Sequence, residues 1–186
     1  MKAPVALSIV VVLLVAWAYN RLVRLRSRTS AAWSQVDVQL RRRHDLIPNL
    51  LTSVQAYMAH ERTLLKQIAE TRAQAAALQG DIGARARLES NLEALLIMLT
   101  ATSQAVPQVG ADVHARMLQE ELSSSERRIA FARQHYNDCV MDYNSAIASF
   151  PTNIIAGLCA FRPAILFRNE EFGAEDTIHR TTVACN

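Results

Sequence analysis

The sequence has few of the residues that interrupt or cross-link secondary structure. Its 186 residues include only 5 Gly, 5 Pro and 3 Cys, and aromatic residues make up 6% of the chain. So few Gly and Pro argue against a many-turned all-β protein and exclude collagen-like or low-complexity chains. Cys139, Cys159 and Cys185 lack the close, even spacing of a disulfide framework or a zinc site, so we interpret them as incidental thiols in a reducing compartment.

Motifs that would indicate an enzyme are also missing. The chain has 5 His, but no two are spaced i, i+4 and there is no HExxH, which excludes the helical zinc-hydrolase pattern. Glu-x-x-His, which carboxylate metal cages in helical bundles require, is absent as well. The glycines are too scattered for a phosphate-binding loop. We therefore expect no catalytic residues, no cofactor and no metal.

One long uncharged segment stands at the start of the chain. No charged residue lies between Lys2 and Arg21. A helix from Ala3 to Tyr19 is ~25 Å long, near the lower limit for crossing a bilayer. The segment predicts a single transmembrane anchor whose side chains contact lipid and whose last aromatic residues lie at the interface. The anchor residues are Val5, Leu7, Ile9, Val12, Leu14, Trp17 and Tyr19.

The charge that follows this segment predicts its orientation. Four arginines come at once, Arg21, Arg24, Arg26 and Arg28. They favour an outside N-terminus, a body in the cytoplasm and contact with anionic headgroups. A signal peptide cleaved after Ala16-Trp17-Ala18, or a body on the outer side, stays open as the alternative. The sequence pI near 9.0 is therefore a juxtamembrane effect, and no nucleic-acid partner is expected.

The rest of the chain has the apolar spacing of helices. From Ala31, apolar residues recur every three or four positions as far as Ile68, and Pro48 within this run predicts a kink. Later runs cover 88–99 and 118–147, and a short apolar stretch follows Pro151. Asp112 is the expected N-cap of the last long run.

These runs predict an all-α protein. The expected architecture is an N-terminal transmembrane helix followed by a long antiparallel helical bundle, with coiled-coil-like packing, of three long helices plus a short C-terminal helix. The expected domains are a membrane anchor with its basic flank over residues 1–26, a helical bundle over 27–167 and a polar tail over 168–186.

Several polar residues fall on or beside the predicted core. Arg43 and Glu61 lie on the inner stripe and need partners, either within the bundle, which we favour, or in another subunit. The pairs Tyr136-Asn137 and Tyr143-Asn144 repeat at seven residues, which predicts a buried polar ladder against the first helix or, alternatively, a partner site. The complete candidate face is Arg41, Arg43, Asp45, Asn49, Tyr136, Asn137, Tyr143 and Asn144.

Several strings of residues together resemble the LemA family. They are YNRLVRLR from Tyr19, AWSQVDVQLRRR from Ala32, DLIPNL from Asp45, YMAHE from Tyr57, LQEEL from Leu118 and RQHYN from Arg133. The resemblance implies one N-terminal membrane segment, a long antiparallel helical bundle and no enzyme activity. The chain departs from the family at Val106-Pro107-Gln108-Val109-Gly110, where a Tyr-Pro-Asp-Leu-Lys type of turn is usual, and its ending from Arg168 is atypical.

Together these features predict a single-pass protein of a bacterial inner membrane that acts as a scaffold or adaptor. Its expected partners are membrane lipid, an unidentified protein and further copies of itself. The alternatives are a protein that binds anionic lipid or remodels membranes, and an accessory subunit of a membrane enzyme complex.

Overall fold

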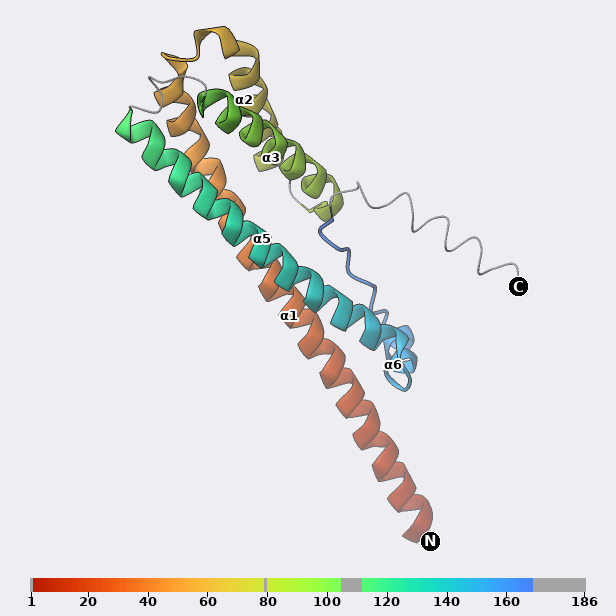
Figure 1. The fold of residues 1–186 in the computed structure, drawn as a ribbon. Coiled ribbons are helices and arrows are strands. Elements are labelled where there is room, and N and C mark those ends of the chain that lie inside the picture. The colour runs from red at the N-terminus through yellow and green to blue at the C-terminus, as the bar shows by residue number, and fades with distance from the viewer. Residues whose placement is uncertain (1, 79, 105–111, 169–186) are drawn as a thin grey trace, which may run out of the picture. The chain divides into compact units, whose positions relative to one another are not determined.

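The computed structural model describes residues 2–78, 80–104 and 112–168, with side chains described from Ser8 onward. Its elements are α1 (Lys2–Gln55), the 3-10 turn η1 (Ala59–Glu61), α2 (Arg62–Ala77), α3 (Ile82–Gln104), α5 (Val113–Ala148) and α6 (Thr152–Leu158) (Figure 1). No strand occurs in those ranges, so the all-α prediction is confirmed. The atypical turn at 106–110 and the tail beyond Arg168 lie outside the described residues.

The chain forms two compact units. Unit 1 consists of Met1–Gln39 and Ile129–Leu166, and unit 2 consists of Leu40–Arg128 and Phe167–Asn186. Helices α1 and α5 each contribute one part to each unit. The domain boundaries expected near residues 26 and 167 stay predictions.

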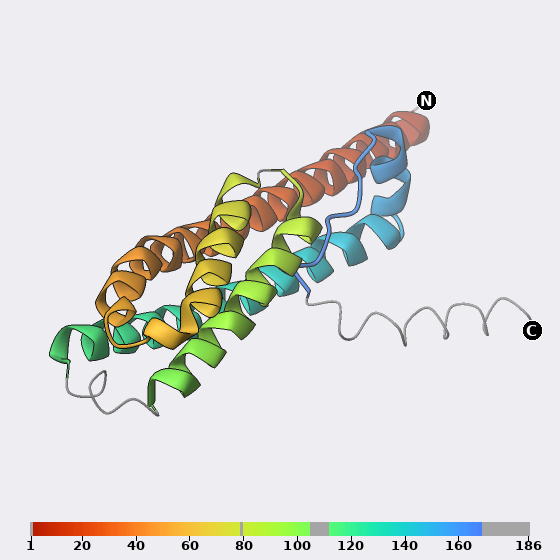
Figure 2. The ribbon, with the colours of Figure 1, turned by 90° about the horizontal axis from the view of Figure 1, so that it is seen from above.

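Unit 2 is a bundle of four helical segments. The end of α1, all of α2 and α3, and the first part of α5 run alongside one another (Figure 2). Each contributes to one apolar cluster, because each has a buried stripe at helical spacing. The cluster contains Ile47, Leu50, Val54, Met58, Leu64, Leu65, Ile68, Leu92, Leu96, Leu99, Ala115 and Leu122.

Unit 1 is built from α1, the second part of α5 and α6. Ala18 and Leu22 of α1 pack in a buried cluster with Ala146, Ile155 and Ala156. Further along, the rings of Trp33 and Tyr136 lie 5.3 Å apart at an interplanar angle of 59°. The same face of α1 is thus covered from Ala18 onward.

The N-terminal part of α1 is not covered. Every side chain from Ile9 to Val15 is between 45% and 65% exposed, and Trp17 and Tyr19 are 47% and 44% exposed. An 18-residue window of this helix has a mean hydropathy of 1.6, with 11% of it buried, so the helix is long and apolar enough to cross a membrane. The side chains of Val5 and Leu7 lie outside the described ones. Arg21, Arg24, Arg26 and Arg28 are all exposed, and the Arg21 guanidinium lies 5.4 Å from the centroid of the Trp17 ring.

The first helix of the bundle is shorter than the apolar run predicted. We expected one kinked helix as far as Ile68, but α1 ends at Gln55 and a new helix starts at Arg62. The amide N–H groups of Tyr57 and Met58 both donate to the Val54 carbonyl at 3.0 Å, and Met58 leaves helical geometry at φ −113°, ψ 44°. The stripe continues through the break because Met58, Leu65 and Ile68 join the same core as Val54.

The course of α1 at Pro48 and the start of α5 at Asp112 can both be compared with the sequence. The helix continues through Pro48, and Asp45 is an exposed residue within it. Asp112 is the N-cap of α5, as predicted: its Oδ1 accepts from the N–H groups of His114 at 2.9 Å and Ala115 at 3.1 Å. These hydrogen bonds lower the pKa of Asp112.

Candidate functional site: a buried charge network

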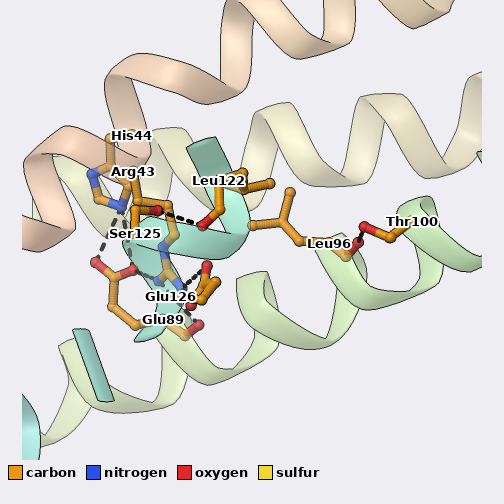
Figure 3. A network of polar contacts seen from close by, with 8 residues as sticks. All are labelled: Arg43, His44, Glu89, Leu96, Thr100, Leu122, Ser125 and Glu126. Atoms are coloured by element: carbon orange, nitrogen blue, oxygen red, sulfur yellow. Dashed lines mark hydrogen bonds and ion pairs between the residues drawn. The ribbon is translucent and has the colours of Figure 1, made fainter. Parts of the chain in front are cut away.

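A buried ion network lies inside unit 2, centred on Arg43 of α1 (Figure 3). The side chain of Arg43 is 1% exposed, because the stripe position that it occupies faces the bundle interior. A buried guanidinium is costly unless its donors are paired, so its neighbours define the site. They come from α3 and α5: Glu89 is 3% exposed and Glu126 is 26% exposed.

The guanidinium bridges the two carboxylates. Its Nη1 donates to both oxygens of Glu126, at 2.9 and 3.0 Å. Its Nη2 donates to Glu89 Oε2 and, at 3.4 Å, to the Glu89 backbone carbonyl. The prediction that Arg43 finds its partners within the bundle is therefore confirmed. Glu61, the other charged residue of that stripe, is only half-buried, at the end of η1.

His44, the next residue of α1, contacts the same carboxylate of Glu89. Its Nε2 lies 3.1 Å from Glu89 Oε1 and 3.3 Å from Oε2. Arg85 approaches Glu89 Oε1 at 3.8 Å from one turn earlier on α3. Glu89 thus contacts Arg43, His44 and Arg85, although it lies in the core.

These contacts act on the two carboxylates in opposite directions. Burial raises the pKa of Glu89, but the hydrogen bond with His44 and the charge of Arg43 outweigh burial, so the net pKa is lowered. Burial also raises the pKa of Glu126, and Arg43 opposes this only in part, so the net pKa is raised. For Arg43, burial lowers the pKa, but the two carboxylates prevail and raise it. Glu89 is therefore the carboxylate that the network holds ionised.

Pro48 connects α2 to this site. A proline has no backbone N–H, so the carbonyl four residues earlier, that of His44, lacks its helical donor. The Nε of Arg72, on α2, donates to that carbonyl at 2.7 Å. The neighbouring Arg42 forms an exposed ion pair with Glu121 of α5 at 2.8 Å, with both side chains 45% exposed. One turn of α1 therefore contacts α2, α3 and α5 through polar groups.

The network suits helix pairing rather than chemistry. Its two carboxylates are engaged by Arg43 and His44, and among the described residues no group of three or more His, Cys, Asp and Glu is placed to hold a metal ion. The Cys139 thiol lies elsewhere, in unit 1, beside a cavity of about 550 Å³. Burial and the charges of Asp142 and Asp138 raise the pKa of this thiol, which is the opposite of an activated nucleophile.

The two tyrosines of the tyrosine–asparagine repeat are buried in unit 1 and the two asparagines are half-buried, but the partners of the repeat differ from the predicted ones. Tyr136 and Tyr143 are 1% and 3% exposed, as their stripe position predicts. The hydroxyl of Tyr136 donates to the carbonyl of Ile165 at 2.8 Å. Asn144 donates to the carbonyl of Ala164 and accepts from its N–H, both at 2.9 Å.

The expectation of a ladder against the first helix is therefore wrong for Asn144 and for the Tyr136 hydroxyl. Both bind the extended backbone after α6, which has no helical partners for its own N–H and C=O groups. Asp45 and Asn49, the residues proposed to receive the ladder, are exposed. Arg41 is exposed as well, and Asn137 is half-buried. The candidate residues therefore do not form one face: Arg43 belongs to the buried ion network, the two tyrosines lie in the core of unit 1, and Arg41, Asp45 and Asn49 are exposed.

Sequence analysis missed Glu89 as part of the site. The buried stripe of α3 is Ala86, Glu89, Leu92, Leu96, Leu99 and Ser103. The repeat of Leu88, Leu92, Leu95 and Leu99 predicts a different stripe, one that has Glu89 beside it. A useful signal was present, since Arg43 needed an anionic partner and Glu89 lies three residues before Leu92.

Comparisons with known proteins agree with this architecture. Residues 32–179 match the LemA family. Two curated relatives are the magnetosome proteins MamQ 1 and MamQ 2 of Paramagnetospirillum magneticum (strain ATCC 700264 / AMB-1). Each is 25% identical over 181 aligned positions, which cover 83% of this chain and 66% of the relative. The chain therefore spans just under two thirds of the length of these relatives.

Proposed function

Since this chain belongs to the LemA family, we propose that it is a membrane-anchored helical scaffold or adaptor without catalytic activity of its own. In this proposal it binds other proteins and self-associates, with its bundle in the cytoplasm. The observation that carries the proposal is that α1 continues unbroken from the exposed apolar segment into the helical bundle. One helix contains the bare apolar segment and, without interruption, side chains that enter the cores of both units.

The bare segment supports the anchor. Seven consecutive apolar side chains, Ile9 to Val15, are at least 45% exposed, which in water would place a continuous apolar surface in contact with solvent. A bilayer removes that cost, because lipid tails are as apolar as these side chains. The exposed Arg21, Arg24, Arg26 and Arg28 supply the cationic flank that favours a cytoplasmic bundle.

The use of the polar groups supports the non-catalytic role. The charges of Arg43, Glu89 and Glu126 join α1 to α3 and α5, so these groups are already paired with one another and are not free for acid–base catalysis. Exposed apolar side chains remain on the outside of both units and are candidates for protein contacts. Phe131 is 78% exposed on α5, and Met98 is 57% exposed on α3.

Orientation is tested with a reporter enzyme that is active only outside the inner membrane, fused after Asn186. We expect a silent reporter, and a reporter fused before Met1 should be active. Strong activity of the C-terminal fusion would overturn the cytoplasmic assignment.

The scaffold role is tested by photocrosslinking in living cells. A photoreactive residue at Phe131 or Met98 of the full chain should give crosslinked protein species, including a dimer of this chain. The matched control is Lys66, whose side chain is 76% exposed and forms an ion pair with Glu70. Equal yields at all three positions would contradict a protein-binding surface.

A lipid-binding role is the second candidate, and the exposed juxtamembrane arginines favour it. Replacing all four with Gln should then abolish a preference of the full chain for vesicles with anionic lipid, and raised salt should weaken that preference in the wild type. If the wild type shows no preference for anionic lipid, this second role is wrong and the scaffold proposal is unaffected.

A further inference from the structure

The short helix α6 exposes an apolar face that nothing in unit 1 covers. Phe150, Ile154 and Leu158 are 79%, 54% and 79% exposed. Ile154 and Leu158, four residues apart, lie on one side of α6, and Phe150 lies in the turn that leads into the helix. Ile155 and Ala156 are buried on the other side, so α6 has large apolar side chains on its exposed side as well as on its buried side, with Asn153 as its exposed polar side chain. A helix of this kind in contact with water is unusual, which indicates a second apolar environment for the exposed face.

The whole connection around α6 is also without charge. No Asp, Glu, Lys or Arg occurs between Asp142, on α5, and Arg162. The one hydroxyl of α6 is satisfied internally, because Thr152 Oγ1 donates to the carbonyls of Ala146 and Ser149, the latter at 2.9 Å. Arg162 is exposed where the connection ends. An uncharged apolar tip with a cationic flank is the pattern of a segment that lies in a membrane interface.

The place of α6 in unit 1 matches this pattern. It packs on Ala18 and Leu22 of α1, and the ring of Phe161 lies 6.0 Å from that of Tyr19. This is the level at which the covered part of α1 begins. Trp17 and Tyr19, the aromatic residues expected at the membrane surface, are at the same level.

The length of the apolar segment places that level at the edge of the hydrocarbon. Spanning the bilayer core takes ~20 helical residues, and an uncharged run from Ala3 to Tyr19 falls short of this. Leu22 must then lie close to the hydrocarbon boundary, one turn (~5.4 Å) beyond Ala18. Leu22 is fully buried by the cluster that includes Ile155 of α6, so α6 occupies the position that lipid would otherwise take.

We infer that α6 is a second membrane-contacting element, which lies in the interface beside α1 and inserts Phe150, Ile154 and Leu158 among the acyl chains. The occupant of this face is the same bilayer that surrounds Ile9 to Val15, because α6 packs on Ala18 and Leu22, which follow that segment directly on α1. The inference rests on the proposed membrane anchoring. Unit 1 then contacts the membrane at two places, through the span and through the α5–α6 connection.

The test uses depth-dependent quenching in the full chain, reconstituted in phosphatidylcholine vesicles with or without nitroxide-labelled acyl chains. Cys159 is exposed directly after α6, so a Cys139→Ser, Cys185→Ser chain presents it as the single site for an environment-sensitive fluorophore. In a chain without the three natural cysteines, Leu14→Cys reports on the anchor and Phe131→Cys serves as the matched control. Phe131 is 78% exposed, as apolar as Phe150, and lies on α5 before the uncharged tip.

We expect the probes at Leu14 and at Cys159 to lose at least about half of their emission to the nitroxide lipid, and the probe at Phe131 to lose none. Replacing Phe150 and Leu158 with Ser should restore the emission at Cys159 while Leu14 stays quenched. If Leu14 is quenched but Cys159 is not, the role of α6 is wrong and the anchor stands. If Leu14 is not quenched, the anchor itself is wrong. Disulfide dimers through an unquenched Cys159 would assign the face to a second copy of the chain, which also overturns the inference.

Discussion

Neutralising Glu89 should destabilise the bundle far more than neutralising Glu126, although both carboxylates bind Arg43. Glu89→Gln keeps the size of the side chain but leaves the guanidinium, which is 1% exposed, with only one ionised partner. Removing one member of a buried ion pair costs about 3–5 kcal/mol. Because Glu126 remains, we expect a loss near the lower end, about 3 kcal/mol. For Glu126→Gln, whose site is 26% exposed, we expect about 1 kcal/mol or less.

The pH dependence distinguishes the two carboxylates further. The pKa of Glu89 is lower in the folded protein than in the unfolded chain, so its ionised form adds stability above the unfolded pKa. That contribution is lost as pH falls through the folded pKa. The pKa of Glu126 is raised, so its ionisation works against folding as pH rises. The difference in stability between wild type and Glu89→Gln should therefore shrink in acid.

Urea unfolding of the full chain in mild detergent, followed by circular dichroism, measures these differences between pH 3 and pH 7. The matched control is Glu121→Gln, which removes the exposed pair with Arg42 and should change stability by less than about 1 kcal/mol. Equal losses for Glu89→Gln and Glu121→Gln would refute the claim that burial makes this network strong. A difference that grows in acid would refute the assignment of the lowered pKa.

Two further predictions concern backbone N–H and C=O groups whose hydrogen-bond partners are side chains. Asn144→Ala removes both hydrogen bonds to Ala164, so hydrogen exchange of the backbone amides of residues 161–166 should accelerate. Amide exchange in α2 should stay unchanged. Unchanged exchange at 161–166 would contradict the role of Asn144 in holding this segment. Arg72→Ala leaves the His44 carbonyl without its donor and should cost about 1–3 kcal/mol, but less in a Pro48→Ala chain, where the restored N–H can bond that carbonyl. Equal costs of Arg72→Ala in the two backgrounds would refute the link between Pro48 and Arg72.

Helical periodicity predicted the helices well where each helix buries one continuous stripe. The last long helix was predicted from leucines and tyrosines that repeat every three or four residues, and its start from Asp112. Its buried tyrosines followed from the same stripe. The information is local in these cases, because a capping side chain and a stripe are properties of one segment.

The end of α1 could not be predicted in this way. Between Pro48 and Gly80 the chain has no Gly or Pro, so no residue marks the break after Gln55. The apolar stripe also continues across it, since Val54, Met58 and Ile68 enter one core from two helices. The chain turns there because burying both stripes against α3 is favourable, which is a tertiary effect that overrides local helix propensity.

The partners of the polar side chains could not be predicted from the sequence either, because they too are set by the tertiary structure. Asn144 binds the non-helical backbone at Ala164, and no periodic pattern predicts where such a segment passes. For Arg43 the sequence showed the need for an anion but not which of many acidic residues would supply it. Glu89 was hidden because a glutamate beside leucines on a helix is most often on the solvent face.

The network also explains why charge is kept in a core that apolar residues could fill. An apolar side chain at position 43 would pack equally well against several turns of α3 and α5, because leucines recur along both helices. Arg43 is satisfied only where α3 presents Glu89 and α5 presents Glu126 at the same level. The Arg72 bond to the carbonyl that Pro48 leaves open fixes α2 at that level too. Arg43 and the carbonyl of His44 on α1 thus specify the register of the other helices in unit 2. An apolar replacement of Arg43, Glu89 and Glu126 together should therefore keep the bundle stable while allowing its helices to slide.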